Sequence, residues 1–260
     1  MYKFIFLLLF LPTFLLAEGL REEGNLVNGE RDGIWRTFNS QGNLIIEGGY
    51  SDGLRNGPWK EFTSDGKMIR QGEYSEGKQT GQWYIFSNGV PTSQGNYVDD
   101  EKHGMWSYYD GKGQLSYRRE YINGTEDGVK ESYYPNSNLE FVHFTKNGSR
   151  HGAWLDYYEN GNIYLESFYE SYCKVGTWKY YHENGKLWKT GRYQGFEKVG
   201  KWYHYDESGA LTDLQEYQEC DANHHTWKGK HARNFKKNLW IAAILLKWKH
   251  TRNAGKRRVN

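Results

Sequence analysis

The stretch that decides the fold, residues 57–74, reads Gly-Pro-Trp-Lys-Glu-Phe-Thr-Ser-Asp-Gly-Lys-Met-Ile-Arg-Gln-Gly-Glu-Tyr. Its opening Gly-x-Trp triplet returns about every 24 residues, with the tryptophans at Trp35, Trp59, Trp83, Trp106, Trp154, Trp178 and Trp202. The 48-residue step after Trp106 contains an eighth unit, which keeps Gly128 but has Lys130 in place of the tryptophan. The sequence therefore predicts an array of eight repeats rather than a globule.

Each repeat contains two short, aromatic-rich runs separated by a turn signal, at Gln41-Gly42, Asp65-Gly66, Asn88-Gly89, Asn160-Gly161, Asn184-Gly185 and Ser208-Gly209. We expect tight β-hairpin turns at these pairs, because asparagine, aspartate and glycine tolerate positive φ. No repeat offers ten residues with the apolar period of a helix. A lone hairpin is marginal in water, so neighbouring hairpins must stack edge to edge. The fold class predicted is all-β: an elongated, single-layer antiparallel sheet of about eight stacked β-hairpin repeats.

A second glycine precedes a recurrent tyrosine by two residues, at Gly48/Tyr50, Gly72/Tyr74, Gly95/Tyr97 and Gly191/Tyr193. Glycine inside a strand indicates close packing, so we expect an aromatic ring of an adjoining strand to lie over it. Each tryptophan and the aromatic residue three positions later point to opposite faces of an ideal strand. A bulge could bring both to one face, and the sequence leaves the two arrangements open.

The pattern Gly-x-Trp-x-x-Tyr-x-x-Asn-Gly-x-Leu, followed by Gly-x-Tyr-x-x-Gly, resembles the MORN repeat, and more closely its bacterial variant, often called YwqK-like. The resemblance extends over residues 24–217. It implies a sheet of consecutive hairpins that serves as a scaffold for protein or lipid contacts. Some bacterial members of the family are labelled antitoxins.

The two ends of the chain differ from the array. Residues 1–17 combine one lysine with an apolar run and Ala17, which predicts a secretory signal peptide, with a short uncleaved anchor as the alternative. We therefore expect an exported protein that is periplasmic, outer-membrane-associated or extracellular. A partner nucleic acid is not expected in that setting.

Residues 222–260 form a basic tail with eleven of the 34 Lys and Arg residues and no acidic one. Its apolar stretch, residues 239–246, is too short to span a membrane and predicts a short C-terminal helix. One hypothesis docks this amphipathic helix on anionic lipid, with candidate membrane contacts at Lys236, Lys237, Trp240, Lys247, Trp248 and Lys249. The other hypothesis makes the helix a cap on the last sheet edge.

No residue cluster predicts catalysis, a cofactor or a metal site. The sequence has no nucleophile elbow and no phosphate loop. Cys220, His224 and His225 lack a fourth zinc ligand. Cys173 and Cys220 occupy equivalent places two repeats apart, roughly 19 Å at about 4.8 Å per strand, so only a fold-back of the chain would join them. We therefore expect no enzyme activity.

The regular pattern breaks in the middle of the array, which suggests an interaction site. Arg119, His143 and Ser167 occupy the second-glycine position in three consecutive repeats, and Lys130 occupies the tryptophan position. One reading is sequence drift; the other is a partly cationic recognition stripe for an acidic partner. The leading functional hypothesis is an exported, non-enzymatic scaffold that binds a protein across an exposed aromatic sheet, and the alternative is a peripheral membrane protein.

Overall fold

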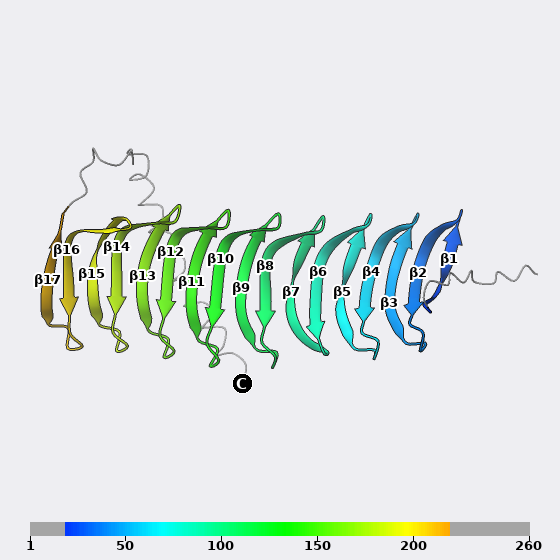
Figure 1. Ribbon diagram of the computed structural model, residues 1–260, viewed down its shortest axis with the longest axis horizontal. Helices are drawn as coiled ribbons and strands as arrows, with labels where there is room; N and C mark the ends of the chain where they lie inside the picture. Colours follow the sequence, from blue (N-terminus) through cyan, green and yellow to red (C-terminus); the bar gives the residue numbers. More distant parts are fainter. Residues whose placement is uncertain (1–18, 219–260) are drawn as a thin grey trace, which may run out of the picture. The chain divides into compact units, whose positions relative to one another are not determined.

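The computed structural model describes residues 19–218, which form seventeen antiparallel β-strands and no helix (Figure 1). The all-β prediction is confirmed for this part of the chain. The predicted signal peptide, the basic tail with its short helix and Cys220 lie outside the described residues. Among the residues described, no helix is long and apolar enough to cross a membrane.

The chain divides into two compact units. Unit 1 is Met1–Ser116 with Tyr121–Gly124, and unit 2 is Tyr117–Glu120 with Thr125–Asn260. The strands of unit 1 are β1 (Arg21–Val27), β2 (Glu30–Phe38), β3 (Leu44–Ser51), β4 (Leu54–Phe62), β5 (Met68–Ser75), β6 (Lys78–Ser87), β7 (Val90–Val98) and β8 (Glu101–Tyr109). The strands of unit 2 are β10 (Thr125–Tyr133), β11 (Leu139–Lys146), β12 (Ser149–Tyr157), β13 (Ile163–Glu170), β14 (Cys173–Tyr181), β15 (Leu187–Gly195), β16 (Glu197–Tyr205) and β17 (Leu211–Tyr217). Strand β9 (Leu115–Ile122) contributes residues to both units.

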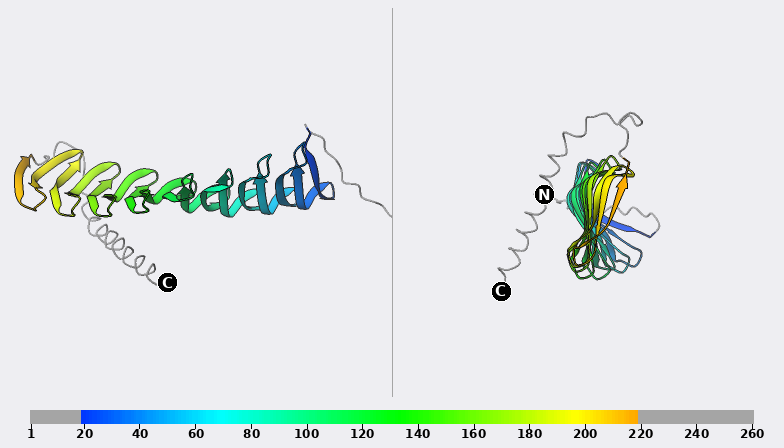
Figure 2. Two further views of the ribbon diagram at one scale, coloured as in Figure 1. Left: turned by 90° about the horizontal axis from the view of Figure 1, so that it is seen from below. Right: turned by 90° about the vertical axis from the view of Figure 1, so that its left-hand side faces the viewer.

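Each repeat supplies two strands with different roles. The even-numbered strands, β2 to β16, carry the Gly-x-Trp position, and the odd-numbered strands carry the glycine and tyrosine positions. Within each unit every strand pairs with the next in antiparallel register, for example β4 with β5 and β12 with β13. The eight predicted repeats therefore correspond to eight even-numbered strands. The strands are curved along their length (Figure 2).

The turns differ from the prediction. Tight two-residue turns mostly follow the odd-numbered strands, as at Glu76 and Gly77, whose φ angles are 49° and 84°. Most of the predicted turn pairs lie instead in five-residue loops such as residues 63–67, where the Thr63 N–H donates to the Lys67 carbonyl at 2.7 Å. The register shifts between Glu61 and Phe62 beside this loop. The same shift occurs between Ile85 and Phe86 in the pairing of β6 with β7, where the connecting turn has two residues. Of the predicted pairs, Asn88-Gly89 alone forms a tight turn, with φ angles of 50° and 80°.

The tryptophans pack on the glycines of the preceding strand. Trp59 on β4 lies opposite Gly48 on β3, and a Cβ atom added to Gly48 would lie 2.0 Å from the Trp59 ring. The same arrangement recurs at Gly24/Trp35, Gly72/Trp83, Gly95/Trp106 and Gly191/Trp202. The expected ring over each glycine is therefore confirmed. Because no side chain other than hydrogen fits under these rings, the glycine is a packing requirement.

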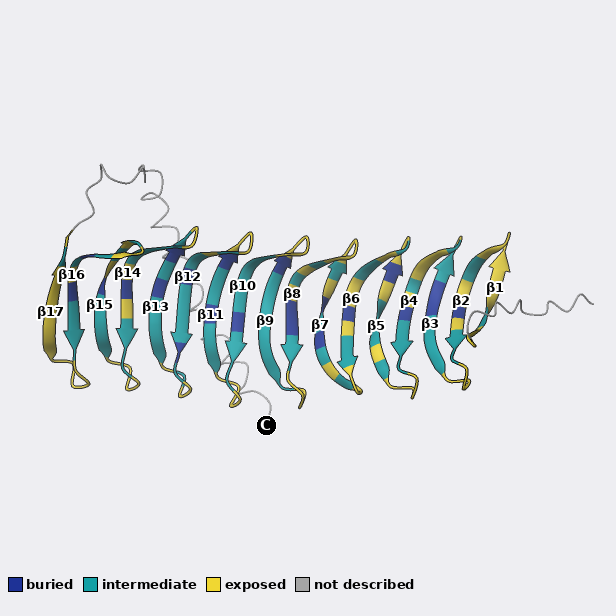
Figure 3. Ribbon diagram, in the orientation of Figure 1, coloured by how far each residue is buried: buried dark blue, intermediate teal, exposed yellow. Residues whose placement is uncertain are grey.

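The tryptophan and the aromatic residue three positions later lie on opposite faces. In β10, Glu131 follows the tryptophan position and points to the other face of the strand. The Tyr133 hydroxyl donates to Glu131 at 2.5 Å, so Tyr133 shares that other face. We call the two surfaces the Trp face and the opposite face. Buried segments lie within the strands, whereas the turns and loops at the strand ends are exposed (Figure 3).

The five-residue loops of unit 2 are linked to one another by side chains. The Asn136 and Asn138 amides donate to the Glu159 carbonyl at 3.0 and 2.8 Å. The same contacts recur one repeat later, from Asn160 and Asn162 to Glu183 and from Asn184 to Glu207. We call this series the loop ladder. It satisfies loop carbonyls that would otherwise bond to water.

Candidate interaction face

A cation recurs four residues before the tryptophan on the Trp face. The six positions are Arg31, Arg55, Lys102, Arg150, Lys174 and Lys198, which we call the cation row. Each charged group lies between 4.3 and 4.7 Å from the centre of the tryptophan ring of its own strand. Each also lies within 5.5 Å of a tyrosine ring of a neighbouring strand or its own. The repeat therefore builds the same cation-on-aromatic contact six times.

The aromatic rings under the cations form edge-to-face contacts. The Trp59 and Tyr74 ring centres lie 5.1 Å apart at 74°, and those of Tyr74 and Trp83 lie 5.3 Å apart at 90°. The cations also use the tyrosine hydroxyls: Arg55 donates to Tyr74 at 3.2 Å, and Lys198 donates to Tyr217 at 3.2 Å. Contacts of this kind contribute about 0.5–2 kcal/mol each, depending on desolvation. They hold the charged groups at fixed places on the face.

Cations on the two faces differ in their partners. On the opposite face, Arg36 and Lys60 both approach Glu47, at 2.8 and 3.7 Å, and Lys179 pairs with Glu166 at 3.0 Å. In the cation row, Arg31 pairs with Glu22 at 2.6 Å. Within residues 19–218, no ion pair joins the other five cations of the row to a carboxylate. Five of the six cations of the row therefore rest on aromatic rings without an ion pair to a carboxylate in the described part of the chain.

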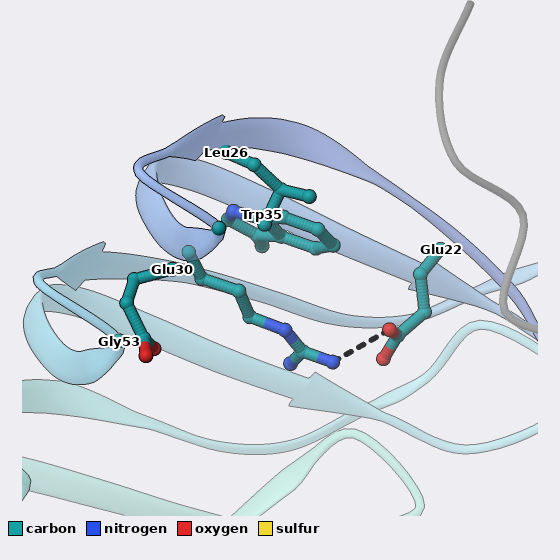
Figure 4. Close-up of a pocket in the computed structure, with 7 residues that line it drawn as sticks. Glu22, Leu26, Glu30, Trp35 and Gly53 are labelled. Carbon is teal, nitrogen blue, oxygen red and sulfur yellow. Dashed lines mark hydrogen bonds and ion pairs between the residues drawn. The ribbon is translucent and has the colours of Figure 1, made fainter.

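A recess at the start of unit 1 shows how Arg31 is neutralised (Figure 4). Its volume is roughly 310 Å³, and Glu22, Leu26, Glu30, Trp35 and Gly53 line it together with Gly29 and Arg31. Leu26 occupies the position that later repeats fill with tyrosine. The dashed line in Figure 4 marks the Arg31–Glu22 ion pair. This recess therefore offers no free charge to an anionic ligand.

The repeat that lacks a tryptophan has an ion pair in place of the cation–aromatic contact. Glu126 stands at the cation position and Lys130 at the tryptophan position, and Lys130 Nζ lies 3.0 Å from Glu126 Oε2. Arg119 also pairs with Glu126. Burial of Glu126 would raise its pKa, but the hydrogen bonds from Lys130 and Arg119 prevail and lower the pKa below its usual value. The predicted site residues Arg119 and Lys130 therefore share one internal carboxylate.

The predicted site residue His143 replaces the glycine under a tryptophan. Its ring stacks on Trp154 with centres 3.8 Å apart at 7°, and on Phe141 with centres 4.1 Å apart at 8°. Its Nε2 atom lies 2.6 Å from Asp156 Oδ1. The tryptophan thus lies flat on a side chain rather than on a bare backbone, and it stays half-buried.

The predicted site residue Ser167 is almost completely buried, with 1% of its surface exposed. It donates a hydrogen bond to the Trp154 carbonyl at 3.2 Å. The next tryptophan, Trp178, has a buried indole nitrogen with no hydrogen-bond partner among the described atoms. In most other repeats the indole N–H donates to a carbonyl of the preceding strand, as Trp202 does to Arg192 at 3.2 Å, whereas Trp59 donates to the Glu61 carboxylate at 2.8 Å. Ser167 therefore has a packing role rather than a surface role.

The register brings three of the four predicted residues into one line across the strands. Lys130 lies opposite His143, His143 opposite Trp154, and Trp154 opposite Ser167. Each of the predicted site residues nevertheless forms its ion pair or hydrogen bond with another residue of the sheet. The predicted exposed aromatic array is also wrong, because the tryptophans at Trp59, Trp83, Trp106, Trp178 and Trp202 are at most 2% exposed. The cations and tyrosines cover them.

The sequence analysis missed the cation row. Its signal was present, because six of the eight repeats have Lys or Arg four residues before the tryptophan position. The predicted membrane contacts of the tail lie outside the described residues. Among the residues described, no group of His, Cys, Asp and Glu side chains could hold a metal ion, and Cys173 forms no disulfide with any of them.

The family model of the MORN repeat variant matches three segments, residues 55–76, 150–171 and 174–194. The first segment lies in unit 1 and the other two lie in unit 2. MORN repeats are generally protein- or membrane-binding repeat motifs. No curated protein matches the sequence.

Similar solved structures include the TCP10 domain of Danio rerio CPAP in complex with a peptide of Danio rerio STIL. That match has 13% identity and a TM-score of 0.29, and it covers 76% of this chain and 99% of that domain. The crystal structure of TarM matches at 12% identity and a TM-score of 0.23, over 50% of this chain and 22% of TarM. The structure of TcdB2-TccC3 matches at 12% identity and a TM-score of 0.20, over 76% of this chain and 14% of that one.

Proposed function

We propose that this chain is an exported, non-enzymatic repeat scaffold that binds a protein partner through its Trp face. The observation that carries the proposal is the cation row, in which five cations lie on aromatic rings with no ion pair to a carboxylate among residues 19–218. Arginine and aromatic residues are enriched where proteins meet. On the opposite face, by contrast, Arg36, Lys60 and Lys179 are already paired.

Three features support the other parts of the proposal. The apolar segment in residues 1–17 favours export. The spacing of the Gly-x-Trp and Gly-x-Tyr motifs favours the YwqK-like variant of the MORN repeat, with the antitoxin-like role that some members are given. A regular sheet whose polar side chains are used in packing leaves little reason to propose catalysis.

Capture of the partner from the cell envelope tests the proposed function. The full-length protein is compared with a variant in which Arg55, Arg150 and Lys174 are changed to Gln. The control changes Lys60, Lys179 and Lys201, which follow or precede the tryptophans on the opposite face, to Gln. We expect the Trp-face variant to lose most of the captured partner and the control to retain it.

The alternative, docking on anionic lipid through the basic tail, makes a different prediction. A truncation to residues 1–221 would then lose flotation with anionic liposomes, and partner capture would be the same for both triple variants. That pair of results would replace the protein-binding proposal with the lipid-docking one.

A further inference from the structure

Unit 2 contains the longest uninterrupted stretch of the cation row. Arg150, Lys174 and Lys198 occupy three consecutive even-numbered strands, β12, β14 and β16. In unit 1 the row is interrupted, because Gln79 stands at the equivalent place in β6 and Arg31 is paired with Glu22. A ligand that contacts several cations at once would therefore find its best site on unit 2.

The three cations of unit 2 form a line that crosses the strands. Lys174 lies opposite Tyr169 and Gly195, and Lys198 lies opposite Tyr193, so the line advances by two strands per repeat. At about 4.8 Å between strands, neighbouring cations of the line are roughly 10 Å apart. Arg150 is exposed, and Lys174 and Lys198 are half-buried on their aromatic rings. The spacing is fixed by the sheet rather than by flexible side chains.

The spacing of roughly 10 Å selects among peptide conformations. A polyproline II segment has three residues per turn and rises about 3.1 Å per residue, so every third side chain lies on one side at about 9.3 Å. In a β-strand, side chains on one side repeat at about 6.7 Å, which does not match. An α-helix returns to one side after seven residues at about 10.5 Å, but it needs about 15 residues to present three carboxylates, and short isolated helices are marginal in water.

We propose that Arg150, Lys174 and Lys198 bind an extended acidic segment of a partner protein in the polyproline II conformation, with Asp or Glu at every third residue. This inference rests on the proposed protein-binding function and adds the chemistry and the spacing of the partner. The segment crosses β12, β14 and β16 on the Trp face. One carboxylate meets each cation, and the intervening residues lie over the aromatic positions between them.

Fluorescence anisotropy with synthetic peptides tests the proposal on the full-length protein. One labelled twelve-residue peptide contains four Glu-Pro-Ser repeats, and the second has the same composition with its four glutamates in one block. We expect the first peptide to bind about fivefold to tenfold more tightly, because only its carboxylates match three cations at once. Binding should weaken as the salt concentration rises.

A matched pair of double variants locates the binding site. Lys174→Gln with Lys198→Gln should weaken binding of the Glu-Pro-Ser peptide by about fivefold to tenfold. Lys179→Gln with Lys201→Gln makes the same charge change on the same two strands, β14 and β16, but on the opposite face, and should change affinity by less than about twofold. Circular dichroism confirms that both variants keep the β-sheet.

Three outcomes would overturn the inference. The two peptides could bind equally well, which would show that the spacing is irrelevant. Both double variants could weaken binding equally, which would remove the Trp face from the site. Anionic vesicles, rather than either peptide, could bind in a manner that depends on Lys174 and Lys198, which would identify a lipid surface instead. If the native partner is still captured through the Trp face while the spacing has no effect, the proposed function stands and this inference alone fails.

Discussion

Units 1 and 2 use the same repeat but fill the space under the tryptophan differently. In unit 1, Gly72 and Gly95 lie directly under the rings of Trp83 and Trp106. In unit 2, that glycine position holds Arg119, His143 and Ser167 in turn before Gly191 restores the regular contact. The strands of unit 2 nevertheless pair in the same antiparallel register.

The difference shows that the glycine–tryptophan contact can be replaced in more than one way. Arg119 coincides with loss of the ring and an ion-pair cluster on Glu126. His143 retains the ring but turns the contact into a flat stack. Ser167 retains the buried ring of Trp178 and leaves its indole nitrogen without a partner among the described atoms. The space at the glycine–tryptophan contact is filled in every repeat, but the side chains that fill it differ.

The largest expected effect contrasts two tryptophans. Trp106 is fully buried and Trp154 is half-buried. Trp106→Ala should lower the free energy of unfolding by about 3–5 kcal/mol, because it leaves a cavity over Gly95. Trp154→Ala should cost about 1–2 kcal/mol, because His143 remains to cover the strand. Urea unfolding followed by circular dichroism measures both, and equal losses would show that the two units pack their aromatic rings equally well.

The second prediction exchanges glycine and serine at the position under the tryptophan ring in the two units. Gly95→Ser should destabilise unit 1 by about 1–3 kcal/mol, because a Cβ atom there would lie 2.3 Å from Trp106 and force its ring away. Ser167→Gly should change stability by less than about 1 kcal/mol, since it loses one hydrogen bond but lets Trp178 approach a backbone acceptor. Thermal unfolding of both variants measures these changes. A larger loss for Ser167→Gly than for Gly95→Ser would reverse the comparison.

The third prediction concerns alkaline pH. Burial, with the nearby charges of Glu166, Asp156 and Glu131, raises the pKa of Tyr157 to about 12. The unfolded value is about 10, so the folded state retains the proton longer, and its stabilising effect is complete below pH 10 and lost as the pH rises towards 12. The loss should reach about 2 kcal/mol near pH 12. Tyr157→Phe should flatten this decline in urea unfolding, and the exposed Tyr172→Phe should not.

The smallest expected effect tests the exchanged contact of unit 2. A double-mutant cycle with Glu126→Gln and Lys130→Gln should give a coupling energy of about 0.5–1 kcal/mol, the upper range for partly exposed ion pairs. The folded pKa of Glu126 is lowered, so this coupling should be complete above the unfolded pKa and be lost as the pH falls through the folded one. A coupling of zero at pH 7 would show that Lys130 only fills space.

The sequence predicted the repeat number, the β class and the ring over each glycine, because these depend on patterns that recur within one repeat. It misplaced most tight turns, because Asp65-Gly66 and Asn88-Gly89 are similar pairs, yet the first lies in a five-residue loop and the second forms a two-residue turn. It selected Arg119 and His143 as surface residues because they depart from the repeat pattern. Their partners, Glu126 and Asp156, lie seven and thirteen residues further along the sequence, and only the strand register shows that they are in contact. Lys174 and Lys198 were overlooked because they belong to the regular pattern.

The loop ladder of unit 2 has a consequence for the number of repeats. Each asparagine side chain donates to a carbonyl 21 or 23 residues downstream. Every inner loop therefore accepts hydrogen bonds from the loop before it and donates to the loop after it. The first asparagine of each loop makes the same contact at every step, whereas Lys186 replaces the second asparagine in the last loop and donates to the Ser208 carbonyl at 2.9 Å. Excising residues 160–183 would leave Asn136 donating to the Glu159 carbonyl and would bring Asn184 to the place of Asn160, at an unchanged offset of 23 residues from Glu207. We therefore expect that whole repeats can be removed from unit 2 or added to it while the remaining loops keep their asparagine–carbonyl hydrogen bonds.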